Sequence, residues 1–130
     1  METINHEYYV SLDVAKLLEA AGFDWDCKDK FYDFTNACKI YKKPTINIVQ
    51  KWLRDIKNIA VYICPVYEPI GNDVNDKWIM KWQVAALHCD IESDEIDLGD
   101  VAKKIFDTYE EALESGEKKV FEIILNNNEI

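Results

Sequence analysis

The chain has only one arginine, Arg54, among its 15 basic residues, and these 15 bases stand against 25 acids. Bidentate recognition of phosphates and of guanine depends on arginine, and binding to nucleic acid or to an anionic membrane needs an excess of basic residues. The formal net charge of −10 therefore argues against direct binding to nucleic acid or to a membrane surface.

Glycine and proline are also scarce, and the four glycines are isolated from one another, so the sequence has no glycine-rich phosphate loop. The longest uncharged run, residues 58–67, is about half of the ~20 residues that a membrane helix requires. The first residues lack the basic and apolar regions of a secretory signal. We expect a soluble, cytoplasmic protein with one compact domain over residues 1–130.

Closely spaced metal ligands are missing as well. The cysteines, none of them in a Cys-x-x-Cys pair, are Cys27, Cys38, Cys64 and Cys89, and the histidines are His6 and His88. The sequence therefore predicts no zinc site and no cofactor, and it predicts free thiols that serve as small core residues. His88 and Cys89 would point to opposite faces of a strand, so a thiol enzyme would need a Cys–His pair formed by the fold. The acidic run that begins at Asp90 starts like a calcium loop, but Glu95 stands where that loop requires glycine.

Three helices are predicted by caps and by apolar spacing, over residues 12–21, 46–57 and 109–125. Ser11 and Thr45 can cap the first two, and Gly22 and Asn58 can end them. Thr108 and Glu111 match the capping box at the start of the third helix. Residues 126–130 are expected to form a frayed tail.

The strand predictions rest on aromatic and β-branched residues. Residues 30–42 are expected to form a hairpin with Asn36 in its turn, and the apolar run 59–64 is expected to be a buried, central strand. Residues 78–87 alternate as a strand does, although a helix over 78–88 remains an alternative. Residues 68–77 and 90–100 are expected to be loops, and 101–106 could be a short strand or a helical turn. These elements predict an α+β fold: one small domain with three helices packed on a small, mainly antiparallel sheet.

Two features could serve recognition of a protein partner. The first is an aromatic group made of Tyr62, Tyr67, Trp78 and Trp82, a residue type enriched at interfaces, and its alternative is that the rings form the core. The second is the acidic group Asp90, Glu92, Asp94 and Glu95. It could bind a basic partner or mimic the charge of DNA, and its alternative is a role in solubility alone.

Several segments resemble a family of small uncharacterised proteins found in gut bacteria and in their phages and prophages. They are Tyr9–Leu18, Gly22–Phe23, Pro44–Thr45, Gln50–Arg54, Asn58–Ile59 and Thr108–Leu113. These segments are helix starts and core positions and carry no chemistry, so the resemblance implies an accessory protein of a phage or mobile element and no reaction. The leading hypothesis is a non-enzymatic binding protein. The alternatives are an acidic inhibitor or DNA mimic that binds a basic protein, and an unrecognised hydrolase or thiol enzyme.

Overall fold

The computed structural model describes residues 8–69, 78–90 and 94–127, and these residues form a small α+β domain. Its helices are α1 (Leu12–Ala20), α2 (Ile46–Ile56), α3 (Asp100–Lys103) and α4 (Tyr109–Asn127). Its strands are β1 (Lys30–Asp33), β2 (Lys39–Lys42), β3 (Ile59–Pro69), β4 (Trp78–His88) and β5 (Asp94–Ile96). The α+β fold class and the three main helices predicted from the sequence are confirmed. Helix α4 continues through Asn126 and Asn127, which were expected to fray, and the rest of the expected tail lies outside the described residues.

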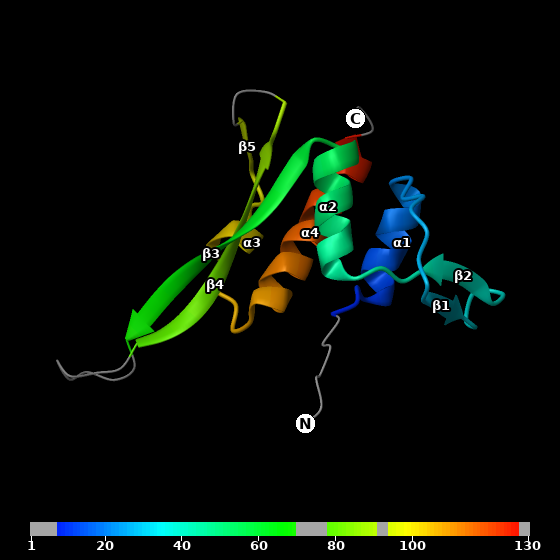
Figure 1. Cartoon of the computed structure of the whole chain (residues 1–130), viewed down its shortest axis with the longest axis horizontal. Helices are drawn as coiled ribbons and strands as arrows, with labels where there is room; N and C mark the ends of the chain where they lie inside the picture. The colour runs from blue at the N-terminus through cyan, green and yellow to red at the C-terminus, as the bar shows by residue number, and fades with distance from the viewer. Residues whose placement is uncertain (1–7, 70–77, 91–93, 128–130) are drawn as a thin grey trace.

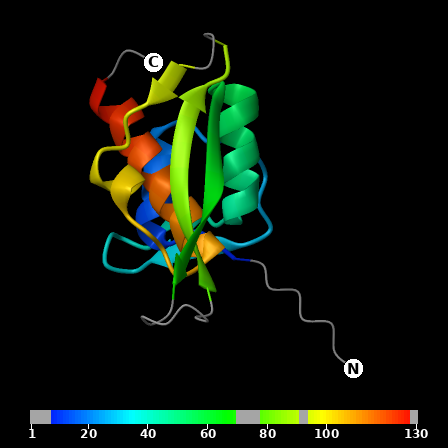
Figure 2. The same ribbon diagram turned by 90° about the vertical axis from the view of Figure 1, so that its left-hand side faces the viewer.

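The elements lie in layers along the long axis of the molecule (Figure 1). The sheet of β3, β4 and β5 is followed by α2 and α4, then by α1, and the hairpin of β1 and β2 lies beyond α1. Figure 2 looks onto the sheet with the helices behind it, so within the described part of the chain the helices cover one face of the sheet. The far ends of β3 and β4 extend past the helices as a two-stranded arm.

The strands form two antiparallel sheets, β1-β2 and β3-β4-β5, where the sequence predicted one. Residues 78–88 are a strand, β4, and it is β4 that occupies the centre of the larger sheet. The prediction that 59–64 is a central strand was wrong, because β3 is an edge strand and continues to Pro69 into the expected loop. The expected loop 90–100 contains β5, which pairs with Ala86–His88 of β4.

The predicted helix starts are confirmed by hydrogen bonds. The Val14 N–H donates to the Ser11 hydroxyl at 3.3 Å, and the Ile48 N–H donates to the Thr45 hydroxyl at 3.3 Å. At α4 the Glu111 N–H donates to Thr108 Oγ1 at 3.1 Å, as the capping box predicts. The Glu111 carboxylate accepts from the Thr108 hydroxyl, where the motif led us to expect the Thr108 amide.

The predicted helix ends and the hairpin turn are tested by the backbone angles. Gly22 and Asn58 have positive φ values of 91° and 58° just after their helices, as expected. The predicted hairpin with Asn36 in its turn is confirmed, and the positive φ values in that turn belong to Ala37 and Cys38. The region 101–106 proves to be mixed, with the short helix α3 followed by a single bridge between Phe106 and Trp82.

Helix α4 contacts the sheet most closely at Gly116, where a side chain would overlap its neighbours. Gly116 is buried against the inner face of β3 and β4, and a Cβ atom there would overlap Val84 Cγ2 and lie 3.3 Å from Val61 Cγ1. On the other side of the helix layer, the buried Trp52 ring of α2 lies between Phe23 and Phe121, with ring centroids 5.4 and 6.1 Å away. The core therefore extends from the sheet through α4 and α2 to the residues that follow α1.

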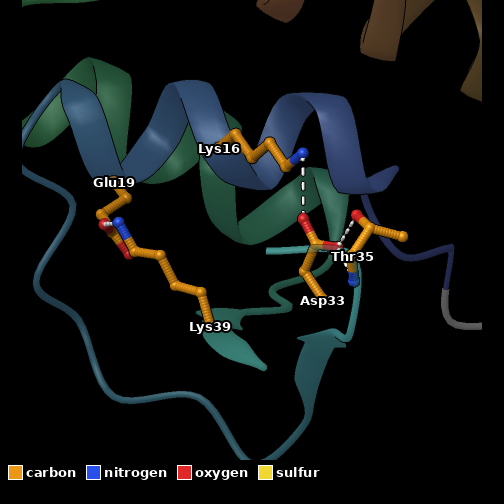
Figure 3. A network of polar contacts seen from close by, with 5 residues as sticks. All are labelled: Lys16, Glu19, Asp33, Thr35 and Lys39. Atoms are coloured by element: carbon orange, nitrogen blue, oxygen red, sulfur yellow. Dashed lines mark hydrogen bonds and ion pairs between the residues drawn. The ribbon is translucent and has the colours of Figure 1, made fainter. Parts of the chain in front are cut away.

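Two ion pairs join α1 to the β1–β2 hairpin (Figure 3). Lys16 Nζ lies 3.1 Å from the buried Asp33 carboxylate, and Lys39 Nζ lies 2.8 Å from the Glu19 carboxylate. Asp33 also accepts from the hydroxyl and the N–H of Thr35, so one carboxylate stabilises the turn and the helix contact together. The Thr35 hydrogen bond and then Lys16 lower the pKa of Asp33 below its ordinary value.

We expect Gly116→Ala to lower the free energy of unfolding by about 1–3 kcal/mol, because the added methyl group overpacks the contact with Val84. Urea unfolding followed by circular dichroism would measure the loss. The change Val84→Ala makes room for the methyl group. The double variant should therefore lose less free energy of unfolding than the two single variants lose when their losses are added. Strict additivity would show that the contact does not limit the helix–sheet distance.

We expect Asp33→Asn to lower the midpoint of thermal unfolding at pH 7. The folded-state pKa of Asp33 is depressed, so its stabilising contribution is present above the unfolded pKa of about 3.9 and is lost as pH falls through the folded value. The difference from the unchanged protein should therefore disappear in acid. The exposed Asp24→Asn is the matched control, and an equal effect of the two changes at pH 7 would contradict the ion-pair account.

Candidate functional site

The arm carries an uncovered apolar surface that continues the inner face of the sheet. In the antiparallel register, residues that face each other across β3 and β4 share one side of the sheet. Val61 and Ala86 form a buried inner pair, and alternation places the following pairs on the same side. We call this surface the arm face, and its residues are Pro65, Tyr67, Pro69, Trp78, Met80 and Trp82.

Helical cover of the arm face stops at Trp82. The Trp82 ring meets Tyr109, the first residue of α4, edge to face with centroids 5.5 Å apart. The backbones of Trp82 and Phe106 exchange two hydrogen bonds, of 2.9 and 2.7 Å, which fix this point of the strand. Beyond it, Tyr67 is 62% exposed, Trp78 is 63% exposed and Met80 is 41% exposed. The interpretation of these rings as core is wrong for Tyr67 and Trp78, because α4 begins too late to cover them.

The predicted aromatic group is thus brought together only in part. Tyr67, Trp78 and Trp82 lie on the arm face, whereas Tyr62 pairs with Ala85 on the opposite side of the sheet. Sequence reasoning missed Met80, which pairs directly with Tyr67, and the two prolines of β3. The alternation of Trp78, Met80 and Trp82 is the signal that could have placed Met80 with the aromatic residues.

The outer edge of β3 is closed to further strands. The side-chain N–H of Gln50 in α2 donates to the Val61 carbonyl at 2.7 Å. The Val61 carbonyl therefore points to the outer edge of β3 and not to β4. Pro65 and Pro69 lie an even number of residues from Val61 along β3, so their backbone nitrogens face the same outer edge. Proline has no N–H, so this edge lacks two hydrogen-bond donors. Pairing with another strand is therefore hindered, and the accessible feature of the arm is its apolar face.

The predicted acidic group lies at the opposite end of β4 from Trp78. Asp90, Asp94 and Glu95 are exposed there, and Glu92 lies outside the described residues. The ten steps from Trp78 to His88 correspond to about 33 Å along an extended strand, so the acidic group and the arm face form two separate surfaces. Within the described part of the chain, Asp90, Asp94 and Glu95 have no ion-pair partner within 4.0 Å.

The cysteines are free, and Cys27 packs against the core, but the prediction of core residues is wrong for Cys38 and Cys89. Cys38 and Cys89 are exposed, and Cys27 and Cys64 are half-buried. Burial raises the pKa of the Cys27 thiol, which makes this thiol less reactive at neutral pH. Among the residues that the structure describes, no three His, Cys, Asp or Glu side chains lie together as a metal site would require.

One buried carboxyl group stands apart from these surfaces. Glu117 of α4 has no exposed area, and neither of its oxygens has a hydrogen-bond partner within the described residues. Burial raises the pKa of Glu117 well above its usual value, and the nearby Glu114 raises it further. Glu114 accepts the Ser11 N–H at 2.6 Å, so its negative charge is held at the start of α1. Burial therefore favours the neutral form of Glu117, and the enclosed side chain is closed to any substrate.

The fold and the surfaces together define a small α+β domain with an apolar arm face and, at the other end of β4, a separate acidic group. Comparison of the chain with protein-family models, with curated proteins and with solved structures found no match. None of the helices in the described ranges has the length and apolar character needed to cross a membrane.

We expect Glu117→Gln to raise the free energy of unfolding at pH 8 by about 1–3 kcal/mol. Burial disfavours the ionised carboxylate of Glu117 in the folded state, and glutamine cannot ionise. The raised folded-state pKa means that the stability of the unchanged protein falls as pH rises from about 4.3 towards the folded value. The gain should therefore shrink towards pH 4. Chemical unfolding at both pH values measures it.

Glu122→Gln is the matched control, because Glu122 is exposed on the same helix. It should leave the difference in stability between pH 4 and pH 8 unchanged. A Glu117→Gln variant that is less stable by the same amount at both pH values would show that the carboxyl makes an interaction that an amide cannot replace.

Proposed function

We propose that this chain is a non-enzymatic binding protein that contacts a protein partner through the arm face. The observation that carries the proposal is the exposure of Tyr67 and Trp78 on a sheet face whose other half is covered by α4. Contiguous exposed apolar surface on a small domain marks interaction sites, and aromatic residues and methionine are enriched at protein interfaces.

The composition of the arm face supports an apolar protein surface as the partner. None of its six residues is charged, so it offers no cationic group to a phosphate, and the chain as a whole carries −10. Binding would therefore depend on apolar area and shape and only weakly on salt. A partner that presents leucine-like or aromatic side chains between polar rims fits this chemistry.

The anchored base of the arm supports the same proposal. Trp82 is held by its ring contact with Tyr109 and by its backbone bonds to Phe106, so the base of the arm is anchored to the body. Anchored aromatic side chains lose little conformational entropy when they bind, because each has only two rotatable bonds. Tyr67 and Trp78 are thus positioned as the central contacts.

The cellular setting belongs to the proposal as well. The resemblance to small proteins of gut bacteria and their phages supports an accessory role for a phage or mobile element in the bacterial cytoplasm. No step of a reaction is assigned, since Glu117, the only strongly perturbed buried acid among the described residues, is enclosed in the core.

A second candidate function is inhibition of a basic protein that binds to the acidic group. The observation that favours it is that Asp90, Asp94 and Glu95 are exposed and have no cation within 4.0 Å in the described ranges. Such a surface attracts a basic partner in a salt-sensitive manner. Capture at low and high salt distinguishes the two candidates.

We expect the double variant Tyr67→Ser, Trp78→Ser to lose its protein partner in affinity capture from lysate of the native cell. Removing two central aromatic contacts weakens an interface by about two kcal/mol or more for each residue, which reduces capture to background. The captured protein is then titrated in purified form against the unchanged chain. Binding should persist in high salt, because the arm face has no charged residue.

Tyr32→Ser, Phe34→Ser is the matched control, because both rings are exposed on the distant β1–β2 hairpin. This variant should capture the same partner as the unchanged chain. Equal capture by the arm variant would overturn the arm-face proposal. Loss of capture in high salt and in Asp90→Asn, Asp94→Asn, Glu95→Gln would instead identify the acidic group as the binding surface.

A further inference from the structure

A small cavity lies between α1 and the β1–β2 hairpin, on the side of the molecule away from the arm. Its volume is about 270 Å³, near the lower limit for small-molecule pockets. Its floor is apolar and is formed by Ala15, Leu18 and Phe23. Ile40 of β2 lies at the mouth with 51% of its surface exposed, so a ligand in the cavity would cover an apolar side chain.

Two lysines face each other at the mouth of this cavity. Lys30 of β1 and Lys42 of β2 are direct cross-strand partners, and both line the cavity. Like charges placed directly opposite each other destabilise an antiparallel pair. Within the described residues, neither ammonium group has a carboxylate within 4.0 Å. The arrangement is unfavourable for the free protein and is relieved by any anion that binds between the two groups.

The other charged groups nearby are already occupied or face elsewhere. Glu19, the only acid among the described residues that line this cavity, is paired with Lys39 at 2.8 Å (Figure 3). Asp26 and Asp29, in the loop before β1, line a different cavity that opens beside the start of α2. The cavity with the two lysines is therefore a positive site in a chain whose net charge is −10.

The two ammonium groups are held in place by the same loop. Lys30 donates to the Cys27 carbonyl, and Lys42 donates to the Trp25 carbonyl at 2.9 Å. An ammonium group has three N–H donors, so each lysine retains two for a ligand. The pair is thus positioned before any ligand arrives, which lowers the entropy lost on binding.

We propose that this cavity binds a small organic anion, namely a carboxylate carried on an aromatic or short acyl body. The apolar part lies on the floor of Ala15, Leu18 and Phe23, and the carboxylate lies between Lys30 and Lys42. The site is independent of the arm face, which lies at the other end of the molecule.

Titration of the full chain with cinnamate, followed by calorimetry and by backbone amide chemical shifts, tests the proposal. We expect saturable binding, with the largest shifts at the lining residues of α1 and β2. The uncharged cinnamamide has the same shape and should bind about tenfold or more weakly, because it lacks the charge-assisted bonds to the lysines. Octanoate in place of cinnamate distinguishes an aromatic body from an acyl one.

The variant Lys30→Gln, Lys42→Gln should lose about tenfold or more in affinity for cinnamate. Lys28→Gln, Lys103→Gln removes the same charge from two exposed lysines outside the cavity and should bind as the unchanged chain does. Lys30→Arg, Lys42→Arg keeps both charges, so retained binding in that variant shows that the loss does not come from misfolding. Equal binding of cinnamate and cinnamamide, shifts confined to other regions, or no saturable binding of either carboxylate would overturn the proposal.

Discussion

The contact between Gly116 and the inner face of the sheet sets the spacing of the whole molecule. Because this position has no side chain, α4 lies directly on Val84 and Val61, and the face that it turns to the sheet is buried. Its opposite surface then receives α1 and α2, with Trp52 seated against Phe121. A larger residue at position 116 would force either the Val84 side chain or α4 to shift, because its Cβ atom would overlap Val84 Cγ2. The helix–sheet distance is thus the constraint on which the other layers depend.

Local chemistry predicted most of the helices and little of the sheet. Ser11, Thr45 and Gly22 act through bonds or angles within a few residues of themselves, so their roles are visible in the sequence. Strand β5 is three residues long and mostly charged, and it exists because β4 offers it a partner edge. The position of β3 at the edge likewise depends on which strand β4 pairs with, which no local pattern determines.

The candidate site was predictable in residue type but not in exposure. Tyr67 and Trp78 are residues that a small core would also use, and the difference between core and surface depends on where α4 starts relative to β4. The pairing of Lys30 with Lys42 follows from the predicted hairpin with Asn36 in its turn, but the cavity beside the two lysines depends on where α1 packs. Both surfaces become visible only when segments distant in the chain are placed side by side.

In the arm, the backbone pairing of the strands and the exposed side-chain surface are separate features, because the outer edge of β3 is closed. The strand ladder of the arm is held by backbone bonds to β4, and its outer side is closed by Gln50 and by the two prolines. The side chains of the arm face take no part in that ladder. Substitutions at Tyr67, Trp78 or Met80 therefore leave the backbone ladder and the closed edge in place, and they change mainly the surface that the arm presents.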